Sequence, residues 1–108
     1  MSIFGKIVSA IRSLVQGDLT REQVEAKVTA AAERSGEKLE PLASIVDLLK
    51  ALDMDSGLDA RRELAEELGY TGALDGSAAM NMWLHAQVMK RIADHYIDVP
   101  GDANTRPA

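Results

Sequence analysis

The stretch from Ser44 to Gly72 constrains the fold most, because it carries two helical patterns separated by a break. In the first pattern, apolar residues recur three and four positions apart, which is the spacing of one helix face: Leu42, Ile45, Val46, Leu49 and Leu52. Residues 53–57 (DMDSG) then interrupt the pattern with residues typical of turns. A second apolar face follows before Gly69, a residue suited to a left-handed helix stop: Leu58, Leu64, Ala65 and Leu68. We expect two amphipathic helices folded back on one another, with the rest of the chain packed on this pair.

The same spacing rules, applied to the whole chain, predict an all-α protein. We expect a small helical bundle of four core helices plus an amphipathic N-terminal helix, over residues 3–16, 20–35, 41–53, 57–68 and 77–96. Thr20, with Gln23 three residues on, has the spacing of a capping box, and Ser56 and Ser77 are suited to cap the last two helices. Pro41 fits the first turn of the third helix.

The sequence divides into three segments. Residues 1–17 form an amphipathic leader helix, residues 18–98 the bundle domain, and residues 99–108 a tail without periodicity that we expect to be flexible. Hydrophobic residues make up 46% of the 108 residues but aromatic residues only 4%, so the core must be largely aliphatic. Trp83 has the largest apolar side chain, and we expect it to anchor the core against the central helix pair.

The charge distribution argues against nucleic acid as a partner. The leader helix carries Lys6 and Arg12 without an acid, so the remainder of the chain carries −7 within a net charge of −5. An acidic body repels phosphates and gains nothing from counterion release. No apolar run reaches the roughly 18 residues that a membrane-spanning helix needs. Because Lys6 and Arg12 also interrupt the leader, it does not resemble a signal peptide, and we predict a cytoplasmic protein.

The leader helix has the clearest interaction pattern in the sequence. One of its faces is continuously apolar: Ile3, Phe4, Ile7, Val8, Ile11, Leu14 and Val15. A face of this size must meet its own domain, a second copy, a protein partner or a lipid surface. We favour protein contact, either within the chain or by docking and self-association, and retain the membrane surface as an alternative.

No group of residues has the spacing expected of a catalytic or metal site. Asp53 and Asp55 resemble the start of a calcium loop, but Gly57 is one position early, and Leu64 stands where a bidentate Glu is required. His85 and His95 are ten residues apart on one expected helix, without a third ligand. The chain has no cysteine, which excludes disulfides and thiolate ligands. We therefore predict a non-enzymatic protein-interaction module that requires no cofactor.

Four segments together resemble a bacterial family known as a domain of unknown function, DUF3597. They are MSIFGKI at the N-terminus, SIVDLLKALDMDS and RRELAEELGYTG in the centre, and MNMWLHAQVMKRI near the end. The resemblance covers residues 1–17 and about 37–100. It implies a compact helical domain behind a short amphipathic leader, and it implies no activity or substrate. In the family an Ala/Pro-rich spacer often follows the leader, whereas here Gly17 to Thr20 and a polar helix occupy that place.

A second, local resemblance suggests an alternative function. Residues 68–76 (LGYTGALDG) are similar to a loop of helical peptidoglycan-binding modules. This resemblance implies a cell-wall glycan-binding module in which Tyr70 and Asp75 contact the glycan. Alternatively, the pattern records only a shared turn, in which Gly69, Gly72 and Gly76 permit positive φ.

Overall fold

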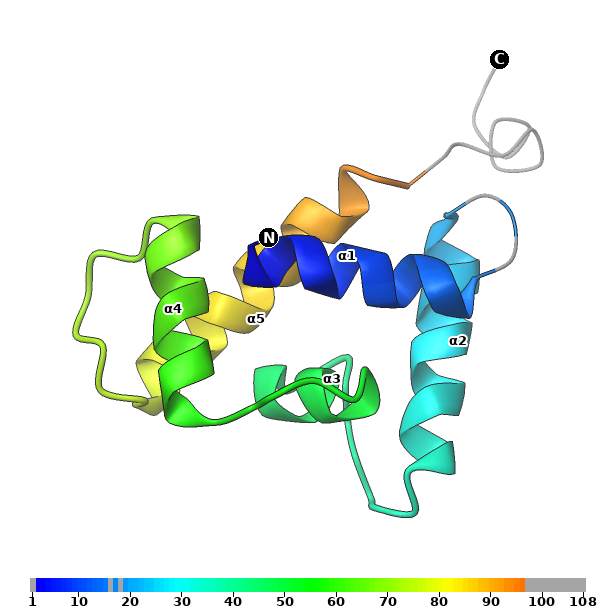
Figure 1. Ribbon diagram of the computed structural model, residues 1–108, viewed down its shortest axis with the longest axis horizontal. Coiled ribbons are helices and arrows are strands. Elements are labelled where there is room, and N and C mark those ends of the chain that lie inside the picture. The colour runs from blue at the N-terminus through cyan, green and yellow to red at the C-terminus, as the bar shows by residue number, and fades with distance from the viewer. Residues whose placement is uncertain (1, 16, 18, 97–108) are drawn as a thin grey trace.

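The described part of the chain folds into helices. A computed structural model describes residues 2–15, 17 and 19–96, and within them five α-helices and no strand are found (Figure 1). The helices are α1 (Ile3–Leu14), α2 (Arg21–Arg34), α3 (Ile45–Ala51), α4 (Leu58–Leu68) and α5 (Ala78–Ala93). The prediction of a small all-α bundle is confirmed. The predicted tail, residues 99–108, lies outside the described residues.

The five helices pack as a closed ring around one core. Helix α1 packs on α2 and α4, α2 packs on α3, and α5 completes the ring by packing on both α3 and α4. We predicted that the helices now called α3 and α4 fold back on one another. This prediction is wrong, because α3 and α4 do not pack extensively on each other. Asp53, which has a positive φ of 58°, ends the turn after α3, and residues 54–57 then lead away from that helix (Figure 1).

The core is aliphatic, as the composition predicts. Every helix contributes residues to one cluster of buried side chains: Ile7, Ile11, Val15, Leu19, Val24, Val28, Ile45, Leu48, Leu49, Leu52, Leu64, Ala65, Leu68, Met80, Leu84, Val88 and Ile92. No buried side-chain nitrogen or oxygen among the described residues lacks a hydrogen-bond partner. The apolar residues thus account for the packing without a buried polar network.

Local sequence signals locate some helix starts correctly. The Thr20 hydroxyl accepts a hydrogen bond from the backbone N–H of Gln23 at 3.2 Å, and Ser77 does the same for Met80 at 3.2 Å. The predicted cap at Ser56 is wrong: Gly57 is the N-cap of α4 and makes no side-chain capping bond. The carbonyl of Ser56 instead accepts a hydrogen bond from Nε of Arg61 at 3.0 Å.

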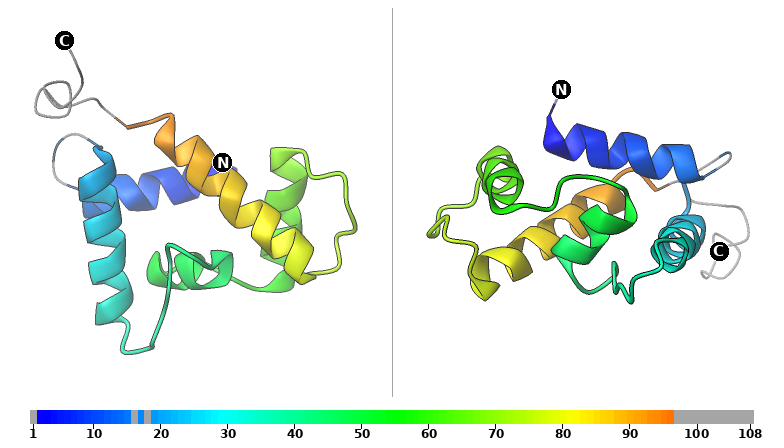
Figure 2. Two further views of the ribbon diagram at one scale, coloured as in Figure 1. Left: turned by 180° about the vertical axis from the view of Figure 1, so that it is seen from behind. Right: turned by 60° about the horizontal axis from the view of Figure 1, so that its bottom comes forward.

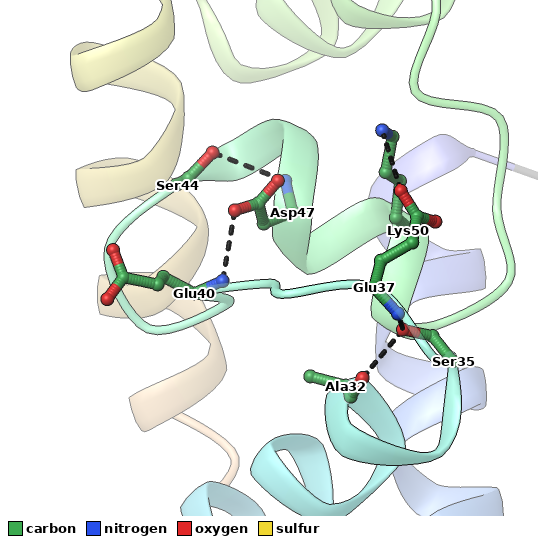
Figure 3. Close-up of polar contacts among 7 residues, drawn as sticks. All are labelled: Ala32, Ser35, Glu37, Glu40, Ser44, Asp47 and Lys50. Atoms are coloured by element: carbon green, nitrogen blue, oxygen red, sulfur yellow. Dashed lines mark hydrogen bonds and ion pairs between the residues drawn. The ribbon is translucent and has the colours of Figure 1, made fainter.

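Helix α3 begins later than the predicted residue 41, because Ser44 and Asp47 define its start (Figure 3). The Ser44 hydroxyl accepts from the backbone N–H of Asp47 at 3.2 Å, and the Asp47 carboxylate accepts from the backbone N–H of Glu40 at 2.9 Å. Residues 41–43 therefore form a turn before the helix, which places Pro41 outside it. A 3.5 Å ion pair between Lys50 and Glu37 further ties this connection to α3.

The leader helix is an integral part of the ring. The carboxylate of Glu67, near the end of α4, accepts hydrogen bonds from the backbone N–H groups of Ile3 at 2.8 Å and Phe4 at 3.1 Å. The Ser2 hydroxyl accepts a third, from Gly5 at 2.8 Å. Three of the free amides at the start of α1 are thereby satisfied, and the carboxylate also complements the helix dipole. Helix α1 is thus attached to α4 at one end and packs on α2 as well.

Candidate interaction surface

Helix α5 has two apolar faces, and only one of them belongs to the core. Its inner face carries residues four positions apart that are 0–2% exposed: Met80, Leu84, Val88 and Ile92. Residues four positions apart lie on one face of a helix, so these side chains form a single buried stripe. Seen from behind, α5 passes in front of α1, and no other helix lies in front of α5 (Figure 2, left).

The outer face of α5 is also apolar. Its residues repeat at intervals of three and four, and we call them the outer stripe: Ala79, Met82, Ala86, Met89 and Ala93. Met82 is 72% exposed, and Met89 is half-buried. The three alanines are exposed. Lys90 is the charged residue beside this stripe, on the same side as Trp83. Exposed apolar residues aligned over the length of a helix are typical of a binding face.

Two hollows border the outer stripe. The first lies between α5 and the start of α3, and is lined by Ala43, Val46, Ala78 and Met82 among others. The second lies between α5 and α2, encloses about 320 Å³, and is lined by Arg21, Glu25, Met89, Lys90, Ala93 and Tyr96. Burial, reinforced by the negative charge of Glu25, raises the pKa of the Tyr96 phenol, which is uncharged near neutral pH. Each hollow is lined in part by a methionine of the stripe, the exposed Met82 in the first and the half-buried Met89 in the second.

The start of α3 extends this surface. Leu42 is 42% exposed, and it shares a short turn with Pro41, whose carbonyl accepts a hydrogen bond from Nε2 of His85 at 3.0 Å. His85 thus has a structural partner, and it anchors the turn to α5. Leu42 and Met82 are the large hydrophobic residues most exposed among those described.

Trp83 lies at the edge of the core and not within it. Its side chain is half-buried, and its ring packs on that of Tyr70 with centroids 4.8 Å apart. Tyr70 in turn lies over Gly72, where an added Cβ would lie 2.5 Å from the phenol oxygen. Gly72 is therefore required for this close approach and not, as predicted, for a positive φ. The positive φ values predicted for Gly69 and Gly76 are confirmed, at 88° and 73°.

The two residues predicted to contact glycan both have roles inside the protein. Tyr70 packs against Trp83 and the core. Asp75 is exposed, and its carboxylate accepts a hydrogen bond from the backbone N–H of Ser77 at 3.0 Å, just before α5. Hydrogen bonding to Ser77 lowers the pKa of Asp75. The loop thus positions the start of α5, and nothing in its geometry tests glycan binding.

The seven residues of the leader face are placed against the protein itself. Ile7, Ile11 and Val15 are buried in the core. The other four residues, Ile3, Phe4, Val8 and Leu14, are half-buried. Ile3, Phe4 and Leu14 pack against that core, so the face is covered from within the chain. The burial of these seven residues does not test whether the leader also contacts a partner, a second copy or lipid.

Sequence reasoning missed the outer stripe, although a signal for it was present. The repeat Ala79, Met82, Ala86, Met89 and Ala93 is as regular as the buried one. Two apolar stripes on opposite sides of one helix would have indicated two packing partners.

Two other kinds of site are absent from the part of the chain that the structure describes. No three His, Asp or Glu side chains in the described part of the chain are grouped closely enough to hold a metal ion. None of the helices formed by these residues is both long and apolar enough to cross a membrane.

Comparison with known proteins gives a family but no activity. Among curated proteins, none matches this chain. The chain is 41% identical to a conserved unknown protein, RPA2825 from Rhodopseudomonas palustris, whose solution structure is known; the TM-score is 0.69, and the match covers 94% of this chain and 98% of that one. The similarity of residues 68–76 to peptidoglycan-binding modules is not borne out by these matches. Residues 15–100 match the family described as Domain of unknown function (DUF3597), and the chain belongs to that family.

Proposed function

We propose that this protein is a non-enzymatic protein-interaction module whose binding face is the outer stripe of α5. The observation that carries this proposal is Met82: a large apolar side chain, 72% exposed, in the middle of an apolar helix face. Such a face costs free energy in water and regains it when it is covered, at about 25 cal/mol for each Å² of apolar surface. Protein contact is the use that best fits a helix face bordered by hollows.

The charges around the stripe support a protein partner over nucleic acid. Lys90 alone does not make a basic patch, and the chain as a whole carries −5. Phosphate contacts need clusters of Lys and Arg, because they supply most of the affinity for nucleic acids. An uncharged helix face instead suits another apolar helix, which docks by inserting side chains between those of the stripe.

This proposal changes the predicted site from the leader helix to α5. Ile7, Ile11 and Val15 already contribute to the core, so exposing them would require α1 to detach from Glu67 and from its neighbours. Met82 and its neighbours are exposed without any rearrangement. A surface that is available in the folded state is the simpler binding site.

Photo-crosslinking in the cells that produce the protein tests this function. A photoreactive residue is placed at Met82, and in a control at Ala26, an exposed position on α2. We expect a discrete adduct with protein from position 82, absent from position 26, and lost when Ala86→Glu is added. Equal or absent crosslinking at the two positions would contradict the proposal. The identity of the adduct is a separate result, which bears on the following inference.

A further inference from the structure

We infer that the outer stripe of α5 binds a second copy of this chain, with the two α5 helices antiparallel. This inference rests on the proposed function and specifies its partner. It follows from the order of large and small residues along the stripe, from the position of one hollow, and from the placement of Lys90 relative to Trp83.

The stripe is complementary to itself. Methionine and alanine alternate along it, so a packed pair needs each Met to lie against an Ala of the other helix. An antiparallel pair with its two-fold axis between residues 87 and 88 achieves this for both methionines. It places Met82 opposite Ala93 of the second copy, and Ala86 opposite Met89. Because a two-fold axis uses each contact twice, one chain supplies both halves of the interface.

The same register places Met82 at a hollow. Ala93 lines the hollow between α5 and α2, together with Met89 and Tyr96. Ala93 is the residue opposite Met82 in this register, and the two-fold axis repeats the contact in the other direction. Met82 of each copy therefore meets the hollow of the other. A flexible, unbranched side chain such as methionine is well suited to fill an irregular space.

Two residues beside the stripe supply an electrostatic contact. Trp83 and Lys90 lie seven residues apart on the same side of α5, and Lys90 also lines the hollow. In the proposed register, Lys90 of one copy lies two residues, or about 3 Å along the helix, from the level of Trp83 of the other, and the contact occurs twice. An ammonium group near an indole ring is attractive. A register shifted by one heptad also pairs Met with Ala, but it brings Trp83 next to Trp83 and leaves Lys90 without this contact.

The size of the surface predicts that the dimer is weak. Helix α5 has 16 residues, which corresponds to a length of about 24 Å. Two faces of that length bury less than the roughly 1,200–2,000 Å² of a standard stable interface. We therefore expect a monomer at low micromolar concentration and a dimer as the concentration approaches about 1 mM.

Sedimentation velocity over about 5 µM to 1 mM tests the association. We expect the weight-average mass to rise towards twice that of the chain, to remain monomeric in Ala86→Glu, and to rise normally in Ala26→Glu. The two variants make the same change at exposed helical alanines, and only Ala86 lies on the stripe. A monomer throughout the range in the wild type, or equal association by both variants, would overturn the inference.

Cysteine cross-linking tests the orientation and register, because the chain contains no cysteine of its own. Residues 82 and 93 lie about 16 Å apart along one helix, too far for a disulfide within one copy. The variant Met82→Cys with Ala93→Cys should form a disulfide-linked dimer at least about tenfold faster than either single-cysteine variant. Equal rates would overturn the antiparallel register.

The two experiments separate this inference from the function on which it rests. If photo-crosslinking from position 82 yields an adduct with a different protein and sedimentation shows a monomer, the surface is a binding face but the second copy is not its occupant. If position 82 yields no adduct in cells and sedimentation also shows a monomer, both proposals fail. An adduct made of two copies supports both.

Discussion

The carboxylate of Glu67 lies 2.8 Å from the backbone nitrogen of Ile3 and accepts its hydrogen bond, although the two residues are 64 positions apart. The end of α4 thereby caps the start of α1 and closes the ring of helices. Replacing Glu67 by Gln keeps the size of the side chain but removes the charge and one acceptor oxygen. We expect Glu67→Gln to lower the free energy of unfolding by about 0.5–1 kcal/mol, as measured in urea. Glu66→Gln, at the adjacent exposed position, should have a smaller effect; equal losses would show that the cap at α1 is not the cause.

The leader helix contributes to the core, so truncating one of its buried side chains should lower the free energy of unfolding. Ile11 is 2% exposed and lies in the central cluster. We expect Ile11→Ala to cost about 2–5 kcal/mol, because it leaves a cavity that the surrounding helices fill only in part. Ser9→Ala, on the exposed side of α1, is the matched control and should change stability by less than about 0.5 kcal/mol. Similar values for the two variants would mean that α1 detaches readily from the bundle.

The helices were predictable from sequence because their signals are local. Thr20 and Ser77 cap helices that begin where expected, since a capping residue and the amide it satisfies are only three positions apart. The starts of α3 and α4 were predicted less well, since α3 is capped by Ser44 and not begun at residue 41, and α4 is capped by Gly57 and not by Ser56. At both places a side chain makes a contact outside the capping motif: Asp47 accepts from Glu40, and Arg61 donates to the Ser56 carbonyl.

The arrangement of the helices was less predictable, because it depends on contacts between distant residues. Periodicity shows that α3 and α4 each have an apolar face but not which helices cover it: α3 packs on α2 and α5, and α4 packs on α1 and α5. The same difficulty concealed the interaction surface. The stripe that contains Met82 and the one that contains Leu84 have equally regular spacing, and only the structure shows that Met82 is 72% exposed and Leu84 is 0% exposed.

Gly72 allows Tyr70 to pack on Trp83, and its replacement should disturb that pair. A Cβ at position 72 would lie 2.6 Å from Cζ of Tyr70, so Gly72→Ala must displace the tyrosine ring. Because Trp83 is the one tryptophan in the sequence, its fluorescence reports the change directly. We expect a shift in the emission maximum and a loss of about 1–2 kcal/mol of stability.

The cause of that loss can be separated from a backbone effect. Adding Gly72→Ala to a Tyr70→Ala background should cost little, because the clashing ring is already absent. A Gly72→Ala variant that is equally destabilised in both backgrounds would show that the glycine is needed for its backbone and not for the tyrosine.

Asp75 should make the stability of the domain depend on pH. Hydrogen bonds from Ser77 lower the pKa of Asp75 in the folded state below its usual value of 3.8. A carboxylate with a depressed pKa adds stability above its unfolded pKa, and that contribution is lost as the pH falls through the folded pKa. We expect the difference in melting temperature between the wild type and Asp75→Asn to be constant from about pH 7 to pH 5 and to diminish towards pH 2. A difference that does not vary with pH would contradict this assignment.

The most direct test of the binding face is the stability of a variant that makes it polar. Met82→Glu and Ala86→Glu are combined, and the free energy of unfolding is measured at about 1 µM, where the proposed dimer is dissociated. If the outer stripe of α5 is free of contacts within the chain, the double variant should differ from the wild type by no more than about 0.5 kcal/mol at each site. A loss of about 3 kcal/mol or more would show that the stripe is packed inside the monomer and is not available to a partner.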